Sequence, residues 1–185
     1  MQSGSVRRRY TSAFAECLIA GAAAIMERSY GQFYSCLIQD IMRTGLACHV
    51  RWSALHRSRI RESYLLALLA AATSSMRGEM DPQLLEAIEE GLHRSLQYPS
   101  DVVPGSIGDL LKAIVREAES CTAAEGRSPA ESVARSVVRH AGVLGAGDAR
   151  DHVDDRASFA ALAGHLATLG SDWWRTVDER AHMAA

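Results

Sequence analysis

The sequence predicts an all-α fold, a compact bundle of about seven helices in which neighbouring helices are mostly antiparallel. Apolar residues recur at helical spacing through nearly all of the 185 residues, and no segment alternates as a half-buried strand would. Several polar residues stand where helix caps are expected, and most of the links between the expected helices are short. Short links favour antiparallel neighbours.

The first half of the chain is expected to contain three of these helices. The first covers residues 6–28 and ends at Tyr30-Gly31, because glycine interrupts a helix. The second covers residues 32–56, with Gly45 as an interior glycine or a kink. The third covers residues 61–76 and holds the most apolar stretch of the chain, so we expect it to be the central core helix.

Two further helices begin at cap signals. Asp81-Pro82 combines an N-cap residue with proline at the first helical position, which predicts a helix to about residue 97. Two prolines make residues 98–105 a loop. Ser106 with Asp109 resembles a capping box and opens a helix to about residue 121.

The remaining two helices flank a loop rich in glycine and aspartate. Ser128-Pro129 with Glu131 is a stronger capping box and opens a helix to about residue 140. Residues 142–155 are expected to form the exposed loop, and the last helix covers about 155–179. Residues 1–185 are expected to form one helical domain, with an N-terminal subdomain 1–97 and a C-terminal subdomain 106–180 as the alternative.

The composition excludes several classes of protein. Hydrophobic residues make up 48% and charged residues 23% of the chain, as in ordinary globular domains, which excludes wholesale disorder. The longest apolar run, residues 17–26, is too short to span a membrane, so no membrane partner is expected. The four cysteines form no CxxC pair and no signal peptide is recognised, which together favour a reducing cytoplasm.

The charge is unevenly distributed along the chain. Residues 1–62 carry nine arginines and four acidic residues, a net charge of +5, whereas the remainder carries 11 basic and 18 acidic residues, a net charge of −7. An anionic partner for the basic end explains this separation, and two solvated faces explain it equally well.

Seven of the arginines are candidates for one nucleic-acid-binding patch. If the first two expected helices pack antiparallel, the start of the first lies close to the end of the second. Aromatic side chains are interleaved with these arginines, and this combination suits phosphate binding with base stacking. A solvated helix junction is the alternative. The seven arginines are Arg7, Arg8, Arg9, Arg51, Arg57, Arg59 and Arg61.

Two histidine-containing segments are weaker candidates for a metal or cofactor pocket. His49, Trp52 and His56 share one helical face, but the two histidines stand two turns apart and are better explained as surface residues. Carboxylates around His152, among them Asp151 and Asp155, offer oxygen ligands for a divalent cation. The same carboxylates also suit the start of a helix, which we prefer, so no metal or other cofactor is expected.

No catalytic motif is recognised. A P-loop, a GxSxG elbow, a GxGxxG turn and an HExxH pair are all missing from the sequence. The sequence does not exclude a nucleophilic site whose residues come together only in the folded protein. Trp173-Trp174 places large aromatic surface on adjacent helix faces. One is expected in the core and the other against a partner, with Trp52 as a further partner contact. A core position for one tryptophan and a rim position for the other explain the pair equally well.

Paired arginines in the first expected helix are followed by an aromatic, an isoleucine, a Gly-Leu pair and a downstream aromatic. Through this pattern, residues 6–56 resemble the small all-helical subunit of type III-B CRISPR–Cas (Cmr) effector complexes. Leu37-Ile38 stands where the family has Leu-Pro, Arg43-Thr44-Gly45-Leu46 stands for its Asn-Gly-Leu, and Trp52 replaces a phenylalanine. The matching positions are Tyr30, Leu37, Ile41, Gly45, Leu46 and Trp52.

This resemblance implies a non-catalytic subunit that stacks along larger subunits and contacts the guide–target duplex through basic surfaces. A second resemblance, at residues 68–92, is to tellurite-resistance TerB-like domains, through Arg77-Gly78-Glu79 followed by a helix. Those domains usually carry an acidic residue before the glycine, where this chain has arginine.

Three functions follow as expectations. The first is a non-enzymatic helical subunit of a larger assembly, which binds other protein subunits and contacts RNA through the arginine-rich end. The second is a small-molecule- or metal-binding helical domain, with or without catalysis. The third is a regulatory adaptor that binds only protein.

Overall fold

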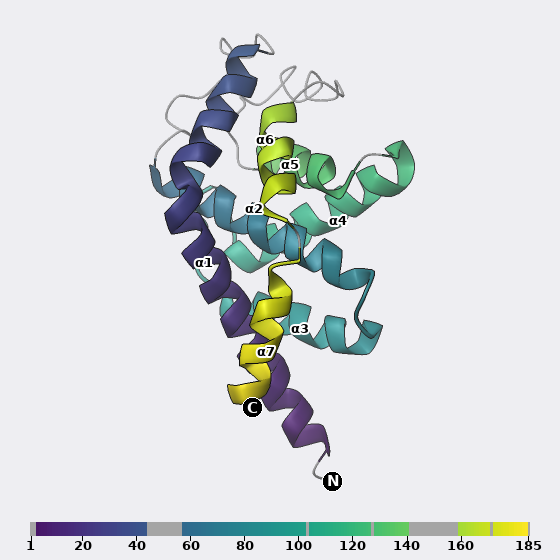
Figure 1. Ribbon diagram of the computed structural model, residues 1–185. Coiled ribbons are helices and arrows are strands. Elements are labelled where there is room, and N and C mark those ends of the chain that lie inside the picture. The colour runs from purple at the N-terminus through teal and green to yellow at the C-terminus, as the bar shows by residue number, and fades with distance from the viewer. Residues whose placement is uncertain are drawn as a thin grey trace.

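The computed structural model confirms the all-α prediction (Figure 1). It describes residues 3–43, 57–102, 104–126, 128–140, 159–170 and 172–184. These segments contain seven helices and no strand. The helices are α1 (Ser3–Arg43), α2 (Arg57–Arg77), α3 (Pro82–Ser95), α4 (Ile107–Glu125), α5 (Pro129–His140), α6 (Ala160–Leu169) and α7 (Trp174–Ala184).

The predicted break at Tyr30-Gly31 is wrong, because α1 is one continuous helix of 41 residues. At a rise of 1.5 Å per residue it is about 60 Å long. Gly31 costs the helix about 1 kcal/mol relative to alanine. The buried face continues across it, from Met26 through Phe33 to Leu37, so packing outweighs the local cost of glycine. The rest of the second expected helix, residues 44–56, lies outside the described residues.

The predicted single helix at residues 155–179 is also wrong. The chain forms α6 and α7 there, separated at Gly170, whose φ of 74° favours glycine. The backbone N–H of Gly170 donates to the carbonyl of Ala167 and ends α6. The number of helices in the described residues equals the expected number, because most of the first two expected helices are one helix and the last expected helix is two. The expected loop at 142–155 lies outside the described residues.

The three predicted cap signals are confirmed. Asp81 accepts a hydrogen bond from the third residue of α3, with Pro82 at its first turn. The Ser106 hydroxyl oxygen accepts from the N–H of Asp109 at 3.1 Å. Ser128 accepts from the N–H of Glu131 at 3.3 Å, and the Glu131 carboxylate accepts from the Ser128 N–H at 2.9 Å. These local pairs fix where three helices begin.

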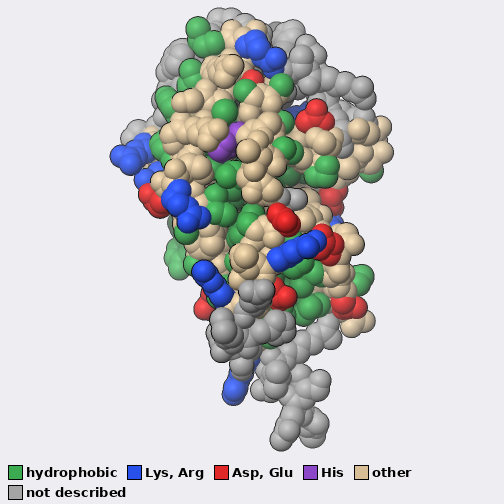
Figure 2. Space-filling view, viewed as in Figure 1, with side chains coloured by type: hydrophobic (Ala, Val, Ile, Leu, Met, Phe, Trp, Pro, Cys, Tyr) green, Lys and Arg blue, Asp and Glu red, His purple; other side chains and the backbone are tan. Residues whose placement is uncertain are grey.

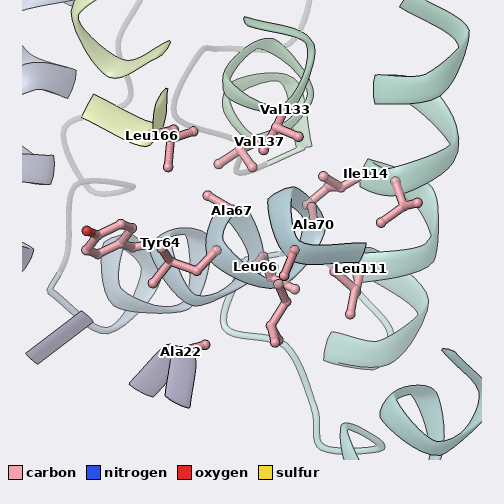
Figure 3. Close-up of a cluster of buried hydrophobic side chains, with 14 of the residues drawn as sticks. Ala22, Tyr64, Leu66, Ala67, Ala70, Leu111, Ile114, Val133, Val137 and Leu166 are labelled. Carbon is pink, nitrogen blue, oxygen red and sulfur yellow. The ribbon is translucent and has the colours of Figure 1, made fainter. Parts of the chain in front are cut away.

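Helix α2 is the central helix of the core, as the sequence predicts. Figure 3 shows its buried side chains between those of other helices, with Leu166 of α6 and Val137 of α5 on one side and Leu111 of α4 on another. Tyr64 is fully buried near the start of the helix. Helix α1 packs along the outside of this core and contacts α2, α3, α6 and α7. In the described part of the chain, no helix is both long and apolar enough to cross a lipid bilayer.

Candidate functional site

The N-terminal end of α1 carries three arginines in a row. The backbone of Arg7, Arg8 and Arg9 is helical, and the Arg9 side chain is exposed. Successive residues are turned by about 100° around a helix, so the three positions surround most of its circumference. The first acidic residue of the chain is Glu16. Figure 1 shows this end of α1 projecting beyond α7. We call Arg7, Arg8 and Arg9 the arginine collar.

Tyr10 anchors the helix directly after the arginine collar. Its side chain is buried, and its hydroxyl donates a hydrogen bond to the carboxylate of Asp178 on α7. Burial, together with this carboxylate, raises the pKa of the Tyr10 hydroxyl, which therefore stays protonated. The contact holds the base of the projecting end against α7, so that the collar extends from a fixed point.

The expected antiparallel pair that would gather the arginines is not formed, because residues 3–43 are one helix. Arg61, near the start of α2, forms an ion pair with Glu27 in the middle of α1. Glu27 stands 18 residues beyond Arg9, which is about 27 Å along a helix. The collar and the α2 arginines are therefore two separate groups. Figure 2 shows basic and acidic side chains interspersed over the face in view.

Two of the α2 arginines contact other parts of the chain. Arg59 donates from Nε to the carbonyl of Asp101 and from Nη2 to that of Val102, at 2.5 and 3.2 Å, and so holds the loop before α4. The Arg61 guanidinium lies 5.8 Å from the ring centre of Tyr30, where the π face attracts it. Arg57 is exposed. Contact with the chain itself explains the positions of Arg59 and Arg61 without an external anion.

Several predicted site residues lie outside the described part of the chain. Among them are Arg51 and Trp52 of the arginine set and the histidine pair beside them. Asp151, His152 and Asp155, the weak metal candidates, also lie there. Among the described residues, no group of three or more His, Cys, Asp or Glu side chains is placed to hold a metal ion.

The structure confirms that one residue of the tryptophan pair enters the core. Trp174 is buried, and its indole Nε1 donates to the Ser75 hydroxyl at 3.3 Å. Trp173 is half-buried and packs against the hydrophobic core. A Cβ built on Gly21 would lie only 2.9 Å from the Trp173 ring, so glycine is what lets α1 approach it.

A buried polar chain links three helices and was not predicted. His165 of α6 lies with Nε2 at 2.8 Å from the Tyr64 hydroxyl, which lies 2.5 Å from the Ser29 hydroxyl. Ser29 itself donates to the carbonyl of Ile25 at 2.7 Å. Tyr64 must therefore donate to Ser29, and His165 Nε2–H to Tyr64. Burial lowers the pKa of His165, which suits a neutral ring in this chain.

A second unpredicted feature is a charged hollow where the end of α2 meets α3 and α4. Arg77 donates from Nη2 to Glu89 at 2.7 Å, and its Nη1 lies 2.5 Å from Glu119. Burial raises the pKa of the Glu119 carboxyl, and Arg77 opposes this shift. Lys112 and Arg116 line the same hollow from α4.

The sequence holds one local signal for this hollow. Lys112 and Arg116 are four residues apart, so they share a face of the helix expected from Ser106 to about residue 121, which is α4. Nothing in the sequence places Arg77 beside them, because that depends on how α2, α3 and α4 pack. Comparison with known proteins adds no relative: no protein-family model, curated protein or solved structure matches this chain.

Proposed function

We propose that the chain is a non-enzymatic helical subunit of a larger assembly, which contacts RNA through the arginine collar at the N-terminal end of α1. One observation carries this proposal. Three consecutive arginines lie on a helix end that projects from the body, and no acidic residue precedes Glu16 (Figure 1). Clustered guanidinium groups attract phosphates, and Asp178, which accepts from Tyr10, is the one carboxylate the structure records beside the residue that follows the collar.

Two further observations support the arginine collar, rather than the arginines of α2, as the RNA-binding site. Arg59 and Arg61 already contact the chain's own carbonyl and carboxylate oxygens. The collar's base is fixed by the contact between Tyr10 and Asp178. A helix end that is already formed loses less conformational entropy on binding than a disordered arm. The placement in a larger assembly rests on the resemblance of residues 6–56 to small Cmr subunits.

The expected interaction is electrostatic and independent of RNA sequence. Each phosphate neutralised on a single strand contributes about −0.7 to the slope of log Kobs against log salt. Binding to a single-stranded oligonucleotide, measured by fluorescence anisotropy from 50 to 300 mM salt, should therefore weaken steeply. A double variant, Arg8→Gln/Arg9→Gln, should reduce the magnitude of the slope by about 1.4, because two phosphate contacts are lost.

A matched control separates the collar from net charge. Arg28→Gln/Arg94→Gln removes the same two charges from exposed positions elsewhere on α1 and α3. The control should keep the wild-type slope. If both double variants lower affinity equally, net charge and not the collar attracts RNA. Affinity that does not change with salt, or no binding by the isolated chain or its assembly, would refute the proposal.

A further inference from the structure

The hollow between α2, α3 and α4 has an apolar floor. Its volume is about 90 Å³, about that of three water molecules in the liquid. Leu92, Leu111 and Val115 line it, and each is at most 5% exposed. The hollow therefore has room only for a ligand of a few non-hydrogen atoms, and part of its wall favours an apolar group.

The rim of the hollow is predominantly basic. Arg77, Lys112 and Arg116 line it against one carboxylate, that of Glu89. Glu119 also pairs with Arg77, at 2.5 Å, so the three cations face two carboxylates and exceed them by one formal charge. The rim therefore favours an anionic group over a cationic or neutral one.

Two of the three cations make no hydrogen bond or ion pair with a described residue, although Arg116 is close enough to Glu119 to lower the pKa of its carboxyl. Lys112 and Arg116 are exposed and stand one turn apart on α4, and no hydrogen bond or ion pair joins either of them to a described residue. Arg77, by contrast, is fixed in place by Glu89 and Glu119. A guanidinium held in this way is already ordered, and beside it stand two exposed cations whose N–H groups make no hydrogen bond to a described residue and can donate to a ligand.

We propose that this hollow binds a small carboxylate with a short apolar tail. The carboxylate is held by Lys112 and Arg116 beside Arg77, and the tail lies on Leu92, Leu111 and Val115. The apolar floor selects such a ligand over inorganic phosphate, which has no apolar group to bury. The proposal is independent of RNA binding, because the hollow shares no residue with the arginine collar.

Titration calorimetry with sodium butyrate, sodium acetate and sodium phosphate, at constant ionic strength set by sodium chloride, tests this site. Butyrate should bind about tenfold more tightly than acetate, because it adds two CH₂ groups that reach the floor. Phosphate should bind more weakly than butyrate. Phosphate binding as tightly as butyrate, or equal binding of acetate and butyrate, would refute the apolar subsite.

The variant Lys112→Gln/Arg116→Gln should weaken butyrate binding at least tenfold, because both cations that are proposed to hold the carboxylate are lost. Arg28→Gln/Arg180→Gln removes equal charge from exposed positions on α1 and α7, which do not line the hollow, and should stay within twofold of wild type. Lys112 and Arg116 are exposed, so the unliganded variant should unfold at the wild-type temperature. No binding by the wild type, or equal weakening in Lys112→Gln/Arg116→Gln and Arg28→Gln/Arg180→Gln, would overturn the proposal.

Discussion

Asp40 of α1 caps α6 from 121 residues away. Its buried carboxylate accepts from the N–H of Ala161 at 3.1 Å and from that of Leu162 at 2.9 Å. The helix has no cap of its own, because the residue at its N-cap position, Phe159, has φ 61° and makes no side-chain cap bond. The negative charge of Asp40 at the N-terminus of α6 also complements the helix dipole, whose positive end lies there. The cap that begins α6 is therefore present only when α6 is docked on α1.

Asp40→Ala should lower the free energy of unfolding by about 2–3 kcal/mol, because two N–H groups lose their acceptor and at least one of them is buried. Asp81→Ala, which removes an exposed local cap from α3, should cost about 1 kcal/mol. Chemical denaturation of both variants measures the difference. A loss for Asp40→Ala no greater than for Asp81→Ala would contradict the capping role.

Gly31→Ala should stabilise the protein by about 0.5–1 kcal/mol. Gly31 lies inside α1, and a Cβ at this position would meet nothing within 4 Å. Alanine loses less backbone entropy on helix formation, and it adds no clash. Thermal unfolding of the variant gives the measurement. If a break at Tyr30-Gly31 existed, as the sequence first suggests, the same substitution would destabilise the protein or leave it unchanged.

Gly108→Ala should destabilise the protein by about 1–3 kcal/mol. A Cβ there would lie 2.7 Å from the backbone carbonyl oxygen of His93, which cannot turn aside as a side chain can. Helices α3 and α4 would have to separate, and the hollow between them would change shape. Gly164→Ala is the matched control, because a Cβ at this helical glycine meets nothing within 4 Å. Equal denaturation midpoints for the two variants would disprove the close contact.

His165 should make the stability depend on pH below about 6.5. Burial lowers its pKa in the folded protein, so the unfolded chain binds a proton that the folded chain does not. The stabilisation from neutral His165 should therefore be fully present above about pH 6.5, the pKa of histidine in the unfolded chain. It should decrease as the pH drops from there toward the lower pKa of His165 in the folded protein. The free energy of unfolding between pH 5.5 and 7.5 measures this effect.

His165→Gln tests the assignment of that pH dependence. An amide can donate to the Tyr64 hydroxyl as His165 Nε2–H does, but it does not titrate in this range. The variant should therefore lose the slope between pH 5.5 and 7.5, whatever its stability at pH 7.5. A slope that stays at the wild-type value would show that other groups cause it.

Local signals in the sequence determine where several helices begin. Asp81-Pro82, Ser106 and Ser128 each cap the helix that follows within three residues, so the relevant contacts are visible in the sequence itself. The apolar stretch that becomes α2 is equally clear, because a helix buried on most sides must be apolar on most sides. The all-α class follows from the same helical periodicity.

Packing between distant segments decides what the sequence alone does not. Gly31 signals a break, but burial of Phe33 and Leu37 keeps α1 continuous, and this separates arginines that a helix pair would have gathered. The cap on α6 and the Ser29–Tyr64–His165 chain join residues 35 to more than 100 positions apart. Their energies depend on distances that exist only once the helices have docked. The hollow beside Arg77 arises in the same way, from three helices that no local pattern brings together.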